Sequence, residues 1–241
     1  TSLNLLRKVD DKVEQVSFSN ASADNEQTNA MMSAMSASTG IGVSTFPEQL
    51  SEENGNFLKD NYDLLQGEYP ASANDVVLIV DENNVTNVNA LINLGFDIKD
   101  GDKVSFDDIV GTTVKLALND AFYTELPTGN FIPNQDLTAV YDNSANKELK
   151  ISGILRIKEK STMNLLSTGI AYSDALAQEV IKENKNSAIV KAQKDSDINV
   201  MTNEKIDAST RDSLIDYLGG SDLPNSIMIY PNDFSSKEKI L

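Results

Sequence analysis

The chain has 241 residues, which is long enough for one or two domains with a buried core. Hydrophobic residues make up 40% and charged residues 24%, a balance typical of globular proteins and too apolar for a disordered one. The formal net charge is −17, and no lysine and arginine cluster interrupts it. These features argue against nucleic acid as a partner and against adsorption to an anionic membrane surface.

Cysteine and histidine are both absent from the sequence. This composition excludes disulfides, thiolate and imidazole zinc sites, and catalysis by Ser-His-Asp or Cys-His groups. The longest uninterrupted apolar run, residues 76–80, is far shorter than the roughly 20 residues of a membrane-spanning helix.

The patterns in the first 45 residues do not predict a single type of secondary structure. Residues 1–18 fit either an apolar helical stripe or a strand that begins near Val16, and both alternatives remain open. Residues 20–45 are small and polar, with three methionines among them, and predict a long loop or a weak helix around 28–36. Such a loop either contacts a partner through its methionines or belongs only to the packing of the domain.

From residue 57 onward the apolar periodicity predicts defined elements in the first half of the chain. These are a helix at 57–65, a strand at 76–80, a helix at 88–94 with Thr86 as its cap and Gly95 as its stop, strands at 114–118 and 137–141, and a long half-exposed strand at 149–157.

The second half predicts an amphipathic helix at 173–185, with Leu176, Val180 and Ile181 facing inward. Short strands follow at 189–190 and 198–201. A capping pair, Ser209 and Asp212, begins another helix that Gly219-Gly220 ends. Helices and strands alternate without regular βαβ spacing, so the sequence predicts an α+β fold with mixed sheets and packed helices.

The densest carboxylate cluster consists of Asp97, Asp100, Asp102, Asp107 and Asp108 around Gly101. Calcium binds six to eight oxygen ligands, which such a loop can supply. The spacing lacks the EF-hand frame and favours a solvated turn before a strand. Whether a weak calcium site exists between Asp97 and Asp108 stays open at the level of sequence.

Two features resemble catalytic groups. Ser236 and Lys239 match the S-x-x-K spacing, but the sequence lacks the K-T-G partner motif, and a helix cap followed by solvated lysines explains the same residues. Thr1 resembles an N-terminal nucleophile. Paired carboxylates for glycoside hydrolysis are conceivable, yet the chain has no tryptophan to line a sugar-binding cleft. We therefore expect no enzymatic activity, no catalytic or metal-binding residues and no cofactor.

The last fifteen residues, 227–241, begin a structural unit that they do not complete. The run IMIY (227–230) predicts a strand, a turn follows at Pro231, and Ser235 with Glu238 forms a capping box for a helix. Only two apolar residues, Ile240 and Leu241, follow in that helix. We therefore expect the sequence to be a piece of a longer protein.

Six further segments are considered together: YDLLQGEYP (62–70), NDVVLIVD (74–81), ISGILR (151–156), GIAY (169–172), NSAIVKAQ (186–193) and LPNSIMIYP (223–231). Together they resemble the large extracellular, MacB-like periplasmic core domain of FtsX/MacB-type ABC transporter permeases from Gram-positive bacteria. The similarity runs from about residue 57 to the end.

This resemblance implies a non-catalytic domain at the outer face of the cell membrane, between two transmembrane helices of the same permease. It also implies a cytoplasmic ABC ATPase as partner and an extracellular substrate or protein partner. Two lobes are expected within the single domain 1–241. Residues 50–150 would form an inserted lobe, and residues 1–49 and 151–241 a membrane-proximal βαβ lobe.

A second hypothesis is a secreted or lipid-anchored binding protein for a peptide or small molecule. An acidic surface would favour a cationic ligand through long-range attraction. Tyr62, Tyr69, Tyr172 and Tyr230 are candidates to line its cleft.

Overall fold

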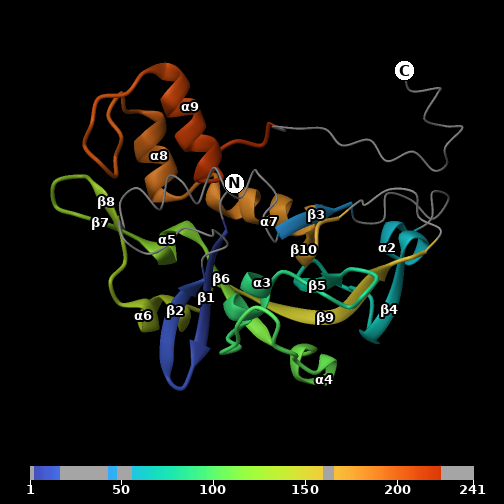
Figure 1. Cartoon of the computed structure of the whole chain (residues 1–241). Helices are drawn as coiled ribbons and strands as arrows, with labels where there is room; N and C mark the ends of the chain where they lie inside the picture. The colour runs from blue at the N-terminus through green and yellow to red at the C-terminus, as the bar shows by residue number, and fades with distance from the viewer. Residues whose placement is uncertain (1–2, 17–42, 48–55, 160–165, 224–241) are drawn as a thin grey trace, which may run out of the picture.

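The computed structural model describes residues 3–16, 43–47, 56–159 and 166–223 of the chain. Within these residues one large mixed sheet carries eight strands, a second sheet has two, and helices pack around them (Figure 1). The architecture is α+β, as the sequence predicts.

The strands of the main sheet are β1 (Asn4–Val9), β2 (Lys12–Val16), β3 (Val43–Phe46), β4 (Tyr62–Gly67), β5 (Asp75–Val80), β6 (Thr113–Ala117), β9 (Lys147–Ile157) and β10 (Gly169–Ser173). The small sheet joins β7 (Tyr123–Glu125) to β8 (Phe131–Pro133). The helices are α2 (Phe57–Asn61), α3 (Val88–Leu94), α4 (Phe106–Ile109), α5 (Asn119–Phe122), α6 (Leu137–Tyr141), α7 (Asp174–Asn184), α8 (Ala188–Lys194) and α9 (Ala208–Tyr217).

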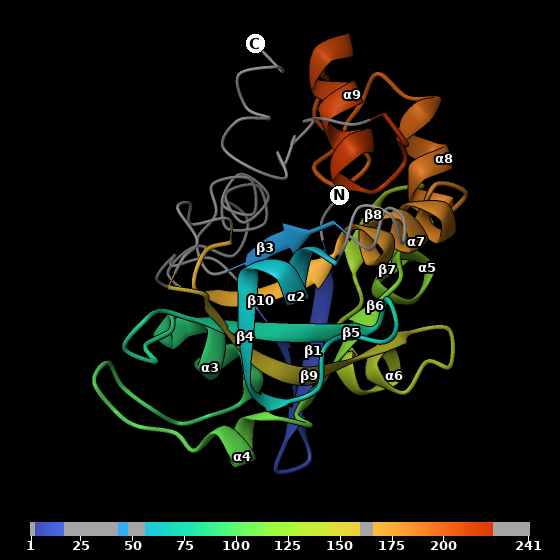
Figure 2. The same cartoon turned by 90° about the vertical axis from the view of Figure 1, so that its right-hand side faces the viewer.

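The main sheet is organised around its longest strand, β9. The order is β2-β1-β6-β9-β5-β10-β3, and β4 also pairs with β9. The first residues of β9 pair antiparallel with β6, the later ones pair antiparallel with β4, and β5 runs parallel to β9. Figure 2 shows β10, β5 and β9 side by side. In both views α3 and α4 lie on one side of this sheet and α8 and α9 on the other.

The central strands of the sheet are buried on both faces. Neighbouring residues of one strand enter different apolar clusters, because successive side chains of a strand point to opposite faces. Leu5 of β1 belongs to the cluster that contains α3, whereas Leu6 belongs to the cluster that contains α8. In β5, Leu78 packs in the first of these clusters and Val77 in a third one, beside α2.

Neither alternative for residues 1–18 matches the structure, because strands β1 and β2 occupy residues 4–9 and 12–16, and β2 ends at Val16, where the predicted strand would begin. β1 and β2 form an antiparallel hairpin whose turn residues, Asp10 and Asp11, have φ angles of 48° and 64°. Two successive residues with positive φ match the type I′ turn, whose twist suits a two-residue hairpin. Residues 43–45, predicted as loop, belong to strand β3, which pairs in parallel with β10. The rest of the predicted loop, residues 20–42, lies outside the described residues.

Several predicted elements agree closely with the structure, namely β5, α3 with Gly95 after it, β6, β9 and α7. Only the cap of α3 differs. Its N-cap is Asn87, whose side chain accepts the Asn89 N–H at 2.9 Å, while Thr86 donates its hydroxyl to the Ile79 carbonyl. Likewise α9 begins after Asp207, whose carboxylate accepts the Thr210 N–H at 2.7 Å, rather than at Ser209.

The prediction of strands at 137–141 and 189–190 is wrong, because both segments are helical. Asp136 accepts the Ala139 N–H at 3.0 Å and so starts α6. Ile189 and Val190 are buried in α8. A short apolar run does not distinguish a buried strand from a buried turn of helix, so its surroundings decided the outcome.

Two further predictions need correction. The helix predicted at 57–65 ends at Asn61, because the chain from Tyr62 onward pairs with β9 as strand β4. At 198–201, the strand is reduced to a single bridge between Ile198 and Lys205. Asn199 explains the break, since its side chain accepts the Met201 N–H and turns the backbone there.

The main sheet contains strands from inside and from outside the predicted inserted lobe, residues 50–150. β4, β5 and β6 fall within residues 50–150, yet they lie among β1, β9 and β10 in the same sheet. The division into two lobes stays a prediction.

Candidate functional site

A pocket of about 160 Å³ lies at the end of strand β3. Figure 2 shows the elements around it, β3, α2 and β10, close together. The pocket is lined by Phe46, Pro47, Asn56, Leu58, Tyr69, Pro70, Ala71, Ser72 and Ser173. Pockets for drug-sized ligands typically enclose about 300–1,000 Å³. This one therefore has room for a single side chain or a small chemical group.

The loop that forms one wall of the pocket is held by a carboxylate. Asp75, at the start of β5, accepts the N–H groups of Ala71 and Ser72 at 3.0 and 2.9 Å and the Ser72 hydroxyl at 3.1 Å. Three hydrogen bonds to one carboxylate fix the loop without help from a ligand. The wall is thus preformed.

The remaining polar groups of the pocket also serve the protein's own structure. The Asn56 side chain accepts the Lys59 N–H at the start of α2, and the Ser173 hydroxyl accepts the Leu176 N–H at the start of α7. Both are N-caps. Because these polar groups are already bonded within the protein, the pocket is suited to bind an apolar or weakly polar group by shape. It is less suited to catalyse a reaction.

The structure brings together two of the four tyrosines predicted to line a cleft. Tyr62 is fully buried, and its hydroxyl accepts the Leu166 N–H at 2.9 Å. Tyr69 lines the pocket and donates its hydroxyl to the Tyr62 carbonyl at 2.9 Å. Burial, reinforced by the Asp63 carboxylate, raises the pKa of Tyr69 above its usual value, so it stays a neutral donor at physiological pH.

The other two tyrosines do not contribute to this pocket as described. Tyr172 borders a separate apolar cavity of about 20 Å³ between β1, β9 and α3, and Tyr230 lies outside the described residues. Sequence reasoning missed Phe46, Asn56 and Ser173. Two local signals were available near the pocket, the prolines at positions 47 and 70 and the Ser72–Asp75 turn. Neither indicated that these segments of the chain meet in space.

The acidic segment 97–108 forms turns and the short helix α4. Asp102 accepts the Lys99 N–H at 2.8 Å, and Asp107 accepts the Gln66 side-chain N–H at 2.5 Å. In the described part of the chain, no three acidic side chains approach closely enough to hold a metal ion. The arrangement gives the calcium alternative no support. The S-x-x-K residues Ser236 and Lys239, and Thr1, lie outside the described residues.

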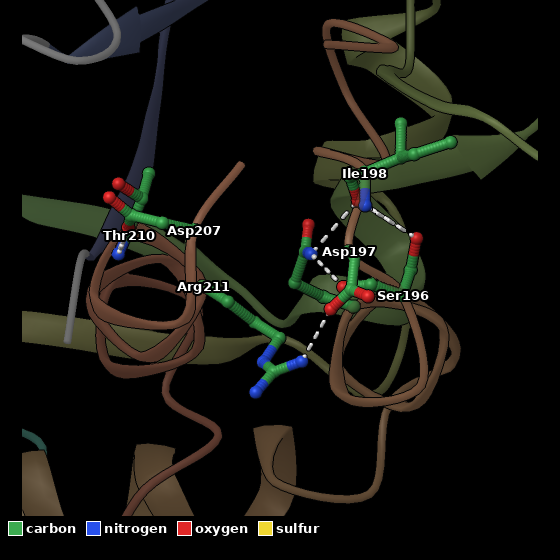
Figure 3. A network of polar contacts seen from close by, with 7 residues as sticks. Ser196, Asp197, Ile198, Asp207, Thr210 and Arg211 are labelled. Carbon is green, nitrogen blue, oxygen red and sulfur yellow. Dashed lines mark hydrogen bonds and ion pairs between the residues drawn. The ribbon is translucent and has the colours of Figure 1, made fainter. Parts of the chain in front are cut away.

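A polar network shapes the loop between α8 and α9 (Figure 3). Arg211 of α9 pairs with Asp197 at 2.8 Å, and the Ser196 hydroxyl bonds to both the N–H and the carbonyl of Ile198. The backbone N–H of Thr210, more than any other group, holds the pKa of Asp207 below its usual value. The carboxylate of Asp197 is 77% exposed, so this ion pair adds little stability. These contacts fix the conformation of the loop between α8 and α9.

Comparisons with protein-family models, with curated proteins and with solved structures gave no match for this chain. Among the described helices, none combines the length and the apolar composition that crossing a membrane requires.

Proposed function

We propose that this chain is a non-catalytic extracellular domain of an ABC transporter permease of the FtsX/MacB type. In this role it engages a substrate or protein partner outside the cell. Transmembrane helices of the same permease connect it to a cytoplasmic ABC ATPase, and ATP hydrolysis there is coupled to its movement.

The observation that carries the proposal is the spatial convergence of four of the six segments that resemble this family. The segments at 62–70, 74–81, 151–156 and 169–172 correspond to β4, β5, β9 and β10. In the sheet β4 pairs with β9, β9 with β5, and β5 with β10. Segments up to about 110 residues apart thus form one continuous block, which supports a resemblance to one structural unit rather than to scattered short motifs.

Single-cysteine labelling in cells tests the location. The chain has no cysteine, so Val85→Cys, at a position 59% exposed, introduces a unique thiol into it. In the parent protein, with any other cysteines replaced, a membrane-impermeant maleimide should label this thiol in intact cells. The matched variant Val77→Cys, at a fully buried position, should react only after denaturation. Labelling of Val85→Cys only after lysis would overturn the proposed location.

Co-purification tests the proposed coupling of this domain to an ABC ATPase. The parent protein, extracted in mild detergent, should retain an ATPase subunit or ATPase domain. Its ATP hydrolysis should change when an antibody clamps this extracellular domain. A parent protein with no associated ATPase would refute the transporter assignment even if the labelling places the domain outside the cell.

A second candidate function is capture of a peptide side chain or small molecule independently of any transporter. The pocket beside Tyr69 and the net charge of −17 favour this candidate, and the charge favours a cationic ligand. Calorimetry of the isolated chain against cationic peptides distinguishes the two. Tight binding that survives added salt, and that Ser72→Trp abolishes by filling the pocket, favours this candidate over the permease domain.

A further inference from the structure

Three helix ends meet at two adjacent residues of the short helix α5. Asn119 is 2% exposed, and its backbone N–H donates to the side chain of Asn184, the last residue of α7, at 2.9 Å. Its side-chain amide donates to the Ser187 hydroxyl at 3.1 Å and to the Leu218 carbonyl at 2.8 Å. Ser187 precedes α8, and Leu218 closes α9.

Asp120 completes this arrangement by capping α8 from a distance. Ser187 is the N-cap of α8, but its side chain caps no N–H of that helix. The Asp120 carboxylate, 68 residues earlier, instead accepts the Ala188 N–H at 2.9 Å. Asp120 and Ala188 are both exposed, so water also reaches this N–H. The hydrogen bond nevertheless ties the start of α8 to α5, beside the buried contacts of Asn119.

Helices α8 and α9 also pack tightly on each other. A Cβ added to Gly220 would lie 2.7 Å from side-chain atoms of both Val190 and Ile215. Backbone hydrogen bonds close the connection between them, with Asn199 N–H on the Glu204 carbonyl and Ile206 N–H on the Asp197 carbonyl. Residues 187–220 therefore form one compact unit, the α8–α9 unit.

We propose that Asn119 and Asp120 act as a latch that ties the α8–α9 unit to strand β6. Because α5 begins two residues after β6 ends, this dipeptide connects the α8–α9 unit to the sheet. It acts beside the hydrogen bond from the Phe131 N–H of β8 to the Val200 carbonyl and the apolar cluster that the unit shares with Leu6 of β1. Breaking the latch lets the unit open as a whole while the main sheet stays folded. The latch is a property of the isolated chain and does not depend on the proposed function.

Hydrogen exchange of the 241-residue chain tests the latch. Asn119→Ala leaves the Ser187 hydroxyl and the Leu218 carbonyl without their buried donor. Amides of α8 and α9 should then exchange about tenfold faster or more, whereas amides of β5 and β9 should change less than twofold. Asn61→Ala is the matched control. It removes one asparagine hydrogen bond, to the Phe57 carbonyl, outside the latch, and should leave α8 and α9 unchanged.

Ser187→Ala and Asp120→Ala are milder variants for the case that Asn119→Ala does not fold. Each removes one latch contact and should produce the same regional pattern with a smaller factor. Equal acceleration in the sheet and in the α8–α9 unit, or no acceleration in the unit, would overturn the latch. Failure of all three variants to fold would do so as well, because the sheet would then require the latch.

Discussion

The main sheet and the region formed by α5 with residues 184–220 bury different kinds of side chain. Of the seven buried polar residues in the described structure, five lie in this helical region, namely Asn119, Asn184, Ser187, Gln193 and Asn199. The other two are Asn4 of β1 and Ser173 of β10. The main sheet therefore buries almost only apolar side chains, whereas the helical region, besides its apolar cluster, also depends on specific hydrogen bonds of buried polar side chains.

This difference has a physical basis. Strand backbones satisfy one another through the sheet, so their side chains are free to be apolar. Short helices leave N–H and carbonyl groups unpaired at every end, and buried ends need polar partners. The two regions should accordingly respond to different substitutions.

The largest effect is expected for Ile154→Ala in the sheet. Ile154 is fully buried in β9, between β4 and β5, and its truncation leaves a cavity. We expect a loss of about 2–5 kcal/mol in the free energy of unfolding. Urea unfolding followed by circular dichroism measures it. Val85→Ala, at an exposed position, should stay within about 0.5 kcal/mol of the parent chain. A similarly small loss for Ile154→Ala would mean that the sheet is not the stability core.

Gly67→Ala should be the next most damaging change. Gly67 ends β4 with a φ of 78°, and a Cβ there would lie 2.2 Å from the Ser152 carbonyl oxygen of β9. Backbone clash and left-handed strain together should cost about 3 kcal/mol or more in unfolding free energy. Gly101→Ala is the control, with a φ of 91° but open space around it. It should cost only the strain, about 1–2 kcal/mol. Equal losses of unfolding free energy in Gly67→Ala and Gly101→Ala would show that β4 shifts along β9 without cost.

Gln193→Ala should reveal the polar dependence of the helical region. Gln193 is fully buried, its amide donates to the Ile198 carbonyl, and its oxygen accepts the Val200 N–H, both at 3.1 Å. Removing it leaves the Val200 N–H unpaired and takes one of two side-chain donors from the Ile198 carbonyl, which should cost about 1–3 kcal/mol in unfolding free energy. Gln135→Ala, at an exposed position, should be close to neutral. Equal behaviour of the two variants would contradict the distinction between the regions.

The smallest effect concerns Asp207, the cap of α9, whose pKa in the folded protein lies below the usual value of an aspartate because its carboxylate accepts the Thr210 N–H. A lowered folded-state pKa contributes stability above the unfolded-state pKa, and this contribution disappears as the pH falls through the folded-state pKa. Asp207→Asn keeps a capping oxygen but does not titrate. The parent chain should exceed this variant in urea midpoint at pH 7, and the difference should shrink below pH 4. A difference that does not change with pH would exclude the carboxylate charge as its source.

Several features could be predicted from sequence because their determinants are local. The run at 76–80 is apolar at every position, as expected of a strand buried on both faces, and it forms β5 in the middle of the sheet. Gly95, with its φ of 106°, ends α3 because a residue without Cβ adopts that conformation at little cost. Ser173 likewise starts α7 as predicted.

Other features depended on partners far away in the chain. Tyr69 was identified as a candidate pocket residue, but Phe46 and Ser173, which complete the pocket, come from strands β3 and β10. No local pattern brings these segments together. Their meeting depends on the parallel pairing of β3 with β10.

By itself the sequence determined the α+β class, three strands of the main sheet (β5, β6 and β9), the helices α3 and α7, and the absence of cysteine and histidine chemistry. Only the tertiary structure decided that 189–190 is helical and that Asn119 and Asp120 hold three helix ends. The physical reason is the distance in sequence. A cap supplied within three residues is visible as a local pattern, whereas the cap that Asp120 gives to Ala188 exists only after the sheet has brought α5 and α8 together.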